Sequence, residues 1–202
     1  MYPYFIPLEG SEGTVCEIAG KPLIMAGSNN YLGLTHHPRV RDAAKAAIDQ
    51  YGTSCSGSRF LNGTLELHEE LERRLAAFMG QEAAVCFSTG FQANLGAISA
   101  ICGKDDLILC DRENHASIID AVRVAGVKNK FRYGHSDMSD LEAQLQKASE
   151  LQKTPKPNGE HPLILVITDG VFSMDGDLAR MPAIVDLCKK YDALSMVDDA
   201  HG

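Results

Sequence analysis

The residues best suited to chemistry follow apolar stretches of the sequence, and the first of them are Ser88, Thr89 and Gly90. They stand between the apolar run 83–87 and a helical pattern over about 90–101. A hydroxyl pair followed by glycine at a helix start presents free backbone N–H groups at the positive end of the helix dipole. This segment therefore predicts a phosphate-binding site. A helix N-cap with a permissive glycine is the plainer alternative.

His115, Asp198 and His201 are the next candidates, because they too follow apolar runs. His115 comes after the run 107–110, where a planar imidazole could face a ligand ring, although a helix-capping histidine would occupy the same place. Asp198 lies at the mouth of the run 194–197, where an ionised carboxylate needs a cationic or hydrogen-bonding partner. Asp198 and His201 could also begin a metal site, but no further ligand stands at a recognisable spacing.

The segment 169–177 follows the strongest apolar run, 163–168, and contains two glycines and three carboxylates. One interpretation is a calcium loop. The spacing, however, differs from the alternating Asp/Asn positions and the distal glutamate of an EF-hand loop. The other interpretation is a solvated acidic turn.

Apolar runs and helical patterns alternate from residue 83 onward. The runs that predict buried strands are 83–87, 107–110, 130–133, 163–168 and 194–197. The helical patterns between them cover 90–101, 116–124, a stretch after Asp137, and 182–191. Strands that alternate with helices of this length predict an α/β fold with a mostly parallel sheet covered on both faces. Ligands of such sheets bind beyond the carboxyl ends of the strands.

The first fifty residues have a different pattern. Short apolar runs at 15–18 and 23–25 predict a small hairpin. Pro38 and Gly52 then bracket an apolar stripe at helical spacing, which predicts a helix between them.

A glycine- and serine-rich loop, 52–64, separates this helix from the next. Thr64 is predicted to cap the second helix, and Gly80 to end it.

The composition excludes several classes of protein. The 202 residues include 19 Lys and Arg against 27 Asp and Glu, a net charge of −8, so the chain lacks the basic stripe of a nucleic-acid-binding protein. Its apolar runs are far shorter than the roughly 20 residues that span a bilayer, and the segment 1–5 lacks the basic start of a secretory signal. Six scattered cysteines without a C-x-x-C pair predict neither a zinc site nor a disulfide framework, and therefore a reducing, cytoplasmic compartment.

Six motifs in a fixed order resemble those of one enzyme family. They are NNYLGL at 29–34, GSRFLNGT at 57–64, STGF at 88–91, NHAS at 114–117, DGVFSMDG at 169–176 and VDDAHG at 197–202. Together they closely resemble the α-oxoamine synthases. These are pyridoxal-phosphate enzymes of the aspartate-aminotransferase fold (fold type I), which condense an amino acid with an acyl-CoA and release CO₂.

The resemblance implies a division of the chain. Residues 1–50 would form an N-terminal arm and a segment of the small domain, and residues 51–202 the first portion of the cofactor-binding large domain. The family is usually homodimeric with shared sites, so Asn29 or Asn30 would reach the site of a partner subunit.

The resemblance also implies how the cofactor is held. Thr89 and Gly90 would bind its phosphate, with Phe91 as a further candidate. His115 would stack on its pyridine ring.

The resemblance further implies that Asp198 pairs with the ring nitrogen, while Ser173 and His201 hydrogen-bond the phenolic oxygen. Pyridoxal phosphate acts as an electron sink while its ring nitrogen is protonated, and a neighbouring carboxylate raises the pKa of that nitrogen.

The family's Schiff-base lysine would lie a few tens of residues after the motif at 197–202. Lys189 and Lys190 do not match its position and look like solvated charges at a helix end. The sequence is therefore expected to be truncated before the cofactor lysine, and the fragment 1–202 to be inactive by itself.

Different stretches resemble different members of the family. The stretch 51–64 looks most like bacterial serine palmitoyltransferases, which would condense serine with a long-chain acyl-CoA to 3-ketosphinganine in sphingolipid biosynthesis. The stretches 114–120 and 191–194 look equally like glycine C-acetyltransferase. 8-Amino-7-oxononanoate synthase, an enzyme of biotin biosynthesis, shares nearly everything else.

Two alternatives belong to other classes. A lysine-less subunit could scaffold an active partner, although the presence of Asp198 and His201 counts against it. A nicotinamide-binding Rossmann domain is disfavoured, because no G-x-G-x-x-G follows the first strand.

Overall fold

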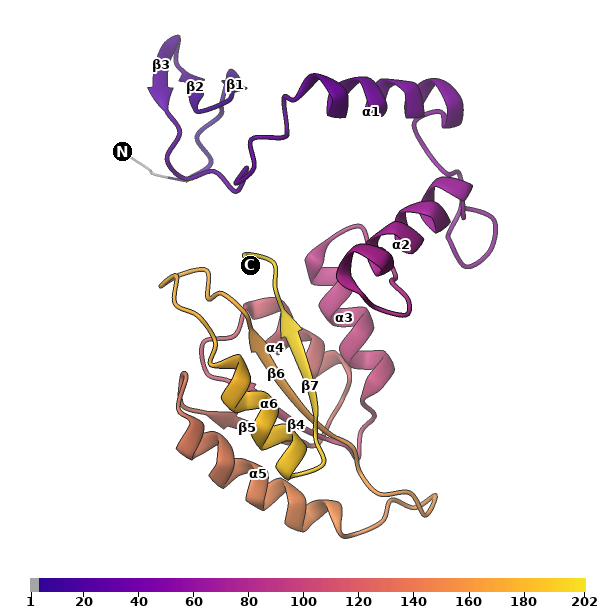
Figure 1. The fold of residues 1–202 in the computed structure, drawn as a ribbon, viewed down its shortest axis with the longest axis vertical. Helices are drawn as coiled ribbons and strands as arrows, with labels where there is room; N and C mark the ends of the chain where they lie inside the picture. The colour runs from indigo at the N-terminus through magenta and orange to yellow at the C-terminus, as the bar shows by residue number, and fades with distance from the viewer. Residues whose placement is uncertain (1–3) are drawn as a thin grey trace. The chain divides into compact units, whose positions relative to one another are not determined.

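The computed structural model describes residues 4–202. They form two compact units, which divide between Ala84 and Val85 (Figure 1). Asn29 and Asn30 belong to the N-terminal unit, and all other candidate residues belong to the C-terminal unit. The predicted division into residues 1–50 and 51–202 of a larger protein stays a prediction.

The N-terminal unit begins with an antiparallel sheet of three short strands, β1 (Gly10–Glu12), β2 (Val15–Ile18) and β3 (Lys21–Ile24). The predicted hairpin is confirmed as β2 and β3. Ala19 and Gly20 connect them with φ of 51° and 67°, the two positive values that a type I′ turn requires. β1 was not predicted, because its residues, Gly-Ser-Glu, contain no apolar side chain.

Two helices follow, α1 (Pro38–Tyr51) and α2 (Glu66–Met79). Both end as predicted, at glycines with positive φ: 75° at Gly52 and 63° at Gly80. Glycine is favoured there because a side chain is strained in this backbone conformation.

The predicted cap of α2 is wrong. The N-cap residue is Leu65, whose backbone N–H donates to His68 Nδ1 at 2.9 Å. The hydroxyl of Thr64 instead donates to the carbonyl of Arg59 at 2.7 Å. Thr64 therefore closes the preceding loop, and the side chain that satisfies an orphan N–H at the helix start comes from inside the helix.

The C-terminal unit alternates helices and strands, as predicted. The elements are α3 (Gly90–Ile101), β4 (Leu107–Asp111), α4 (Ala116–Val124), β5 (Asn129–Tyr133), α5 (Met138–Gln152), β6 (Ile164–Asp169), α6 (Met181–Lys190) and β7 (Leu194–Asp198). The four strands are parallel and lie in the order β5-β4-β6-β7. The predicted α/β class with a parallel sheet is confirmed.

Helices cover both faces of this sheet (Figure 1). In β4, Ile108 and Cys110 face α3 and α4, whereas Leu107 and Leu109 face α5 and α6. β4 and β6 are buried along their whole length, which explains why their sequences read as continuous apolar runs rather than as alternating ones.

The segment 83–87, predicted as a strand, takes no part in either sheet. Val85 is 71% exposed and Phe87 46% exposed. Phe87 packs against α3 instead, where a Cβ added to Gly96 would lie 2.7 Å from its ring. An apolar run becomes a strand only where a neighbour pairs its backbone groups, and the sheets of the described residues offer none here.

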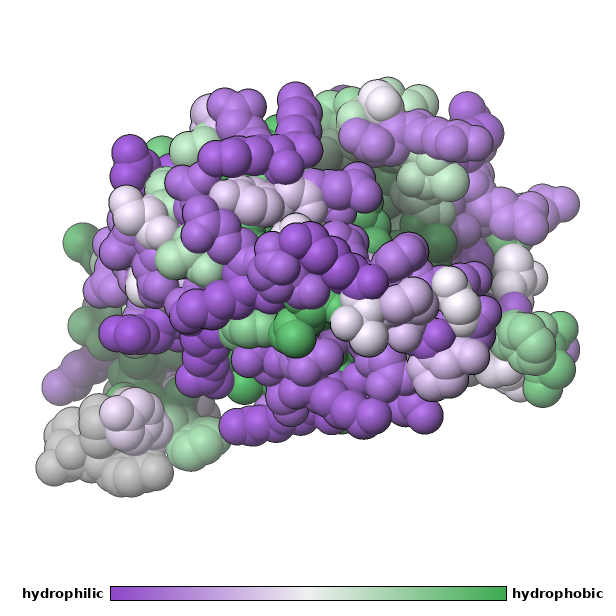
Figure 2. Space-filling view, turned by 90° about the horizontal axis from the view of Figure 1, so that it is seen from below, coloured by the Kyte–Doolittle hydropathy of each residue, from purple (hydrophilic) through white to green (hydrophobic). Residues whose placement is uncertain are grey.

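The face drawn in Figure 2 is predominantly hydrophilic, and its apolar residues form small separate areas. Among the described residues, no helix has both the length and the apolar character to cross a membrane. All six cysteines are free, and four of them, Cys16, Cys102, Cys110 and Cys188, are buried.

Candidate functional site

The strand order creates a crevice at the carboxyl ends of β4 and β6. The chain leaves β4 toward β5 on one side and then returns to β6 on the other, so the loops that follow β4 and β6 diverge. In open parallel sheets, ligands bind at such a switch point. The sequence candidates of the C-terminal unit lie on the loops around it.

A cavity of about 120 Å³ lies at this position. Its walls are formed by Gly90, Phe91, His115, Ser117, Asp169, Val171, Ser173, Asp198, Ala200 and His201. The structure thus brings together six of the predicted site residues, which come from four separate segments of the sequence. Thr89 adjoins Gly90 but is not part of the wall, and Asn29 and Asn30 belong to the other unit.

The N-terminus of α3 opens onto the cavity through Gly90 and Phe91. Thr89 is the N-cap residue, and its hydroxyl accepts a hydrogen bond from the Gln92 N–H at 3.1 Å. The plainer alternative of a capped helix is therefore correct, but the capped end also faces a cavity. A Cβ at Gly90 would meet no protein atom within 4 Å, so the fold itself leaves this backbone accessible to a ligand.

The carboxylate of Asp198 is held at the end of β7. Its Oδ2 accepts from Asn94 Nδ2 at 2.7 Å, and its Oδ1 accepts from the Ala200 N–H at 3.2 Å. Asn94 is only 5% exposed and also donates to Ser117 Oγ at 2.8 Å. These neutral donors supply the hydrogen-bonding partners that the sequence required for this carboxylate, and they leave its charge available to a cation.

His115 is the N-cap residue of α4, so the capping alternative is correct for it as well. Its Nδ1 accepts from the Ser117 N–H at 3.2 Å and lies 2.8 Å from Ser117 Oγ. Since Asn94 must donate to that hydroxyl, Ser117 donates its own proton to Nδ1. His115 therefore carries its proton on Nε2, and hydrogen bonds through Ser117 and Asn94 link its ring to Asp198.

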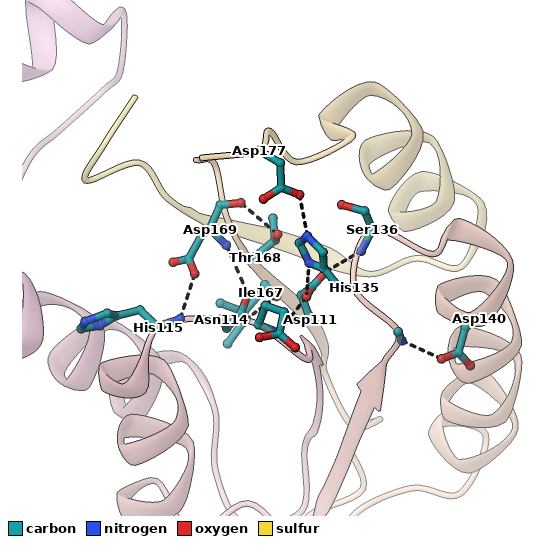
Figure 3. A network of polar contacts seen from close by, with 12 residues as sticks. Asp111, Asn114, His115, His135, Ser136, Asp140, Ile167, Thr168, Asp169 and Asp177 are labelled. Atoms are coloured by element: carbon teal, nitrogen blue, oxygen red, sulfur yellow. Dashed lines mark hydrogen bonds and ion pairs between the residues drawn. The ribbon is translucent and has the colours of Figure 1, made fainter. Parts of the chain in front are cut away.

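Two further side chains connect the loop after β4 to β6 (Figure 3). Asn114 Nδ2 donates to the Ile167 carbonyl at 2.9 Å, and its Oδ1 accepts from the Asp169 N–H at 3.3 Å. Asp169 Oδ2 accepts from the His115 N–H at 2.8 Å. Burial raises the pKa of Asp169, the charge of Asp198 raises it further, and the hydrogen bond from His115 opposes both.

Asn94, Ser117 and Asp169 were not predicted as site residues. The available signal was polarity at a buried position: Asn94 is an amide within the apolar helix 90–101, and Ser117 is a hydroxyl within the apolar stretch 116–122. A buried polar side chain needs a partner, so each marks a position where some other polar group must lie.

The arrangement suits a flat ligand with one anionic and one cationic end. The start of α3 attracts an anionic group, the carboxylate of Asp198 attracts a protonated nitrogen, and His115 offers a planar face. Among residues 4–202, no group of three or more His, Cys, Asp or Glu side chains is placed to hold a metal ion.

Comparison with known proteins identifies relatives for almost the whole chain. Residues 21–202 match the family described as aminotransferase class I and II. A serine palmitoyltransferase of Bacteriovorax stolpii is 52% identical over 202 residues, which are 100% of this chain and 46% of the relative. An 8-amino-7-oxononanoate synthase of Exiguobacterium sibiricum is 45% identical over 196 residues, 97% of this chain and 47% of the relative.

Among solved structures, a serine palmitoyltransferase of S. paucimobilis with a bound PLP–myriocin aldimine superposes with a TM-score of 0.83 at 38% identity. The match covers 93% of this chain and 44% of the solved one. The chain spans about half the length of the curated relatives that it matches. The resemblance to the α-oxoamine synthases is confirmed.

The residues of the cavity fit the cofactor of these relatives. Pyridoxal phosphate carries a phosphate and a ring nitrogen on a flat heterocycle, and the open backbone at Gly90 and the carboxylate of Asp198 are suited to these two groups. From residue 21 to its last residue, the chain belongs to the class I and II aminotransferase family of fold type I, whose cofactor is pyridoxal phosphate.

Proposed function

We propose that the chain is part of an enzyme that condenses serine with a long-chain acyl-CoA, with loss of CO₂, to give 3-ketosphinganine. The observation that carries the proposal is the single cavity that joins the start of α3, His115 and Asp198. The relatives named serine palmitoyltransferase, which match the whole length of this chain, support the choice of substrates.

In this proposal the start of α3 binds the anionic end of the cofactor. Gly90 and Phe91 line the cavity at the N-terminus of α3, and the Thr89 hydroxyl keeps the first turn of the helix in place through Gln92. Since the helix dipole adds positive potential there, the start of α3 would attract the phosphate.

Asp198 would hold the proton on the ring nitrogen, so that the cofactor supplies its chemistry as an electron sink when bound. Asn94 keeps the carboxylate oriented without neutralising it. His115 would lie against the ring plane, and its fixed Nε2–H tautomer keeps a donor on the side of the ring away from Ser117. Ser173 and His201, which also line the cavity, would hydrogen-bond the phenolic oxygen.

No lysine lines this cavity. Lys190 lies at the end of α6, where its Nζ pairs with Glu142 at 2.5 Å. We therefore propose that covalent attachment of the cofactor requires an amine from outside residues 1–202, and that these residues alone do not catalyse the condensation. Borohydride reduction with pyridoxal phosphate tests this, because a cofactor-labelled lysine within 1–202 that supports turnover would contradict it.

The full-length parent, loaded with pyridoxal phosphate, provides the test of function. We expect an absorbance band that shifts on addition of serine, and product formation with long-chain acyl-CoA. Activity with glycine and acetyl-CoA alone would assign the enzyme as a glycine C-acetyltransferase and overturn our choice. Activity only with the substrates of 8-amino-7-oxononanoate synthase would favour that enzyme of biotin synthesis. One such enzyme is 45% identical to this chain.

We further propose a cytoplasmic homodimer in which Asn29 contributes to the site of the partner subunit. Asn30 is engaged within its own loop, where its amide donates to Thr35 Oγ1 at 2.8 Å and accepts from the Thr35 N–H at 3.4 Å. Asn29 is exposed, with Tyr31 as its hydrogen-bond partner at 3.4 Å. Mixed dimers of an Asn29→Ala subunit and a subunit with a defective cofactor site would recover partial activity if the sites are shared.

A further inference from the structure

A second polar cluster lies at the carboxyl ends of β4 and β5 and centres on Asp111, which is 1% exposed (Figure 3). Asp111 Oδ1 accepts from the Glu113 N–H at 2.9 Å and lies 2.9 Å from His135 Nδ1. Its Oδ2 accepts from the Ser136 N–H at 3.0 Å. This carboxylate therefore ties the end of β4 to the segment that follows β5.

His135 has a carboxylate at each of its ring nitrogens. Nε2 lies 2.5 Å from Asp177 Oδ2, on the loop that follows β6. Asp177 Oδ1 is buried and has no hydrogen-bond partner among the described residues, so His135 is the side-chain partner that the structure gives this carboxylate. The imidazole also packs edge-on against Phe172, with ring centroids 4.4 Å apart and an interplanar angle of 83°.

Two acceptors favour the doubly protonated ring. A neutral imidazole has a single N–H, and its other nitrogen would direct a lone pair at a carboxylate. Burial by itself lowers the pKa of His135, but the hydrogen bonds and charges of Asp111 and Asp177 outweigh burial and raise the pKa above its ordinary value.

The other ionisable groups near this cluster are mostly acidic. Asp140 of α5 accepts from the Gly134 N–H at 2.7 Å, and Arg112 lowers the pKa of this carboxyl only as a minor cause. Burial raises the pKa of Asp169 in β6 and of the phenol of Tyr133, and the charge of Asp111 raises both further. The carboxylates among these neighbours favour a cation on the imidazole, and Arg112 is the one cation named among them.

The loop 170–178 connects this cluster to the cavity, because it carries Ser173 of the cavity wall. The Phe172 N–H donates to the Asp177 carbonyl at 3.0 Å, and the Gly176 N–H donates to the Phe172 carbonyl at 2.8 Å. The loop is thus a turn closed by its own backbone hydrogen bonds. Phe172, 3% exposed, anchors it by burial, and the contact at Asp177 anchors it by charge.

We propose that His135 is a positioning residue, whose imidazolium clamps the loop 170–178 to the end of β4. The clamp consists of the two contacts to Asp177 and Asp111, and it sets the position of Ser173 at the cavity. Its consequence for cofactor binding rests on the proposed function, whereas the clamp itself does not.

The clamp depends on pH in a defined direction. The folded pKa of His135 is raised, so its contribution is complete below the ordinary histidine pKa of about 6.5 and is lost as the pH rises through the raised value. The loop 170–178 is therefore more firmly held in mildly acidic than in alkaline solution.

Hydrogen exchange of the loop amides in the whole chain, corrected for intrinsic rates, tests the clamp at pH 6 and pH 9. We expect exchange in 170–178 to be at least about 10-fold faster at pH 6 in His135→Gln than in the parent, because the charged contacts to Asp111 and Asp177 are lost. Asp177→Asn should give a similar increase, and it changes a side chain that is 42% exposed, so it serves if the first variant does not fold. His161→Gln, an exposed histidine bonded to the Gln152 carbonyl, is the matched control and should change nothing.

Loop exchange that is unchanged in either clamp variant would overturn the proposal, as would a parent whose loop exchanges equally at both pH values. Faster exchange in both variants, with a parent at pH 9 that resembles them, would support it. A parallel titration with pyridoxal phosphate should show weaker binding in both clamp variants. If the chain binds no pyridoxal phosphate at all, that result counts against the proposed function, and the loop exchange still decides the clamp.

Discussion

The two units of the chain differ in what surrounds their apolar side chains. In the C-terminal unit, the apolar residues of β4, β6, α4 and α5 form two buried layers on opposite faces of a sheet. In the described part of the N-terminal unit, the only buried hydrophobic residues are Cys16 and Ala76, and the apolar stripe of α2 is about half exposed. Similar helical periodicity in the sequence thus leads to a core in one unit and to an exposed stripe in the other.

The same difference holds for the candidate residues. Asp198 and His115 are placed by hydrogen bonds between segments far apart in the sequence, such as the contact from Asn94 across 104 positions. Asn30 is placed by a contact only five positions away. Local contacts determine the shape of the loop at Asn30, whereas the covered sheet of the C-terminal unit brings residues far apart in the sequence into one site.

The largest expected contrast between the units is in thiol reactivity. Burial raises the pKa of Cys110 to about 12, so at pH 8 its thiolate fraction is about 1000-fold below that of a thiol with a pKa of 9.0. Labelling with iodoacetamide, followed by mass spectrometry, should modify the half-buried Cys55 before Cys110, which should react only on unfolding. Cys16 should label at an intermediate rate, because a sheet of three short strands opens easily. Equal rates for Cys55 and Cys110 would break the comparison.

Matched leucine substitutions test the two cores directly. Leu109→Ala removes a fully buried side chain and should lower the free energy of unfolding by about 3 kcal/mol. Leu71→Ala, at a side chain that is 46% exposed, should cost less than about 1 kcal/mol. Urea denaturation of both variants measures the difference. A similar loss in both would show that the stripe of α2 is buried in solution.

The buried amide at the site provides a smaller contrast. Asn94→Ala removes two hydrogen bonds and leaves Asp198 with the Ala200 N–H, which should cost about 2 kcal/mol and weaken pyridoxal phosphate binding. Asn30→Ala is the control, and its exposed bonds to Thr35 should contribute less than about 1 kcal/mol. Denaturation would measure the loss of stability, and cofactor titration the loss of binding. An Asn94 variant as stable as the parent would argue against the hydrogen bonds from Asn94 to Ser117 and Asp198.

The smallest effect is expected in the hairpin. Gly20→Ala places a Cβ at φ 67° and should destabilise the β2–β3 turn by about 1 kcal/mol. Gly10→Ala is the control, because its φ is not positive and a Cβ there meets no atom within 4 Å. Amide exchange in β2 and β3 should increase only in the first variant and stay unchanged in β4 and β6. Faster exchange in β4 would show that the effect of the substitution is not confined to the hairpin.

The clearest elements could be predicted from sequence because their signals are local. The bounds of α4, Ala116–Val124, follow from an apolar stripe that begins directly after His115. β6 follows from an apolar run that no polar residue interrupts. The N-cap of α2 could not be predicted, because either Thr64 or Leu65 could have been the N-cap residue. The preceding loop places the Arg59 carbonyl where the Thr64 hydroxyl donates to it, so Leu65 is the N-cap.

By itself, the sequence determined most of the strands and helices, their approximate ends and the residue types able to bind a phosphorylated heterocycle. These properties depend on periodicity, turn residues and local motifs, which lie within a few positions of one another. Only the tertiary structure decided that the segment 83–87 is not a strand, that Asn94 orients Asp198, and that His135 bridges Asp111 and Asp177. Pairing and hydrogen bonding across the sheet join residues far apart in the chain, and no local pattern specifies which of them meet.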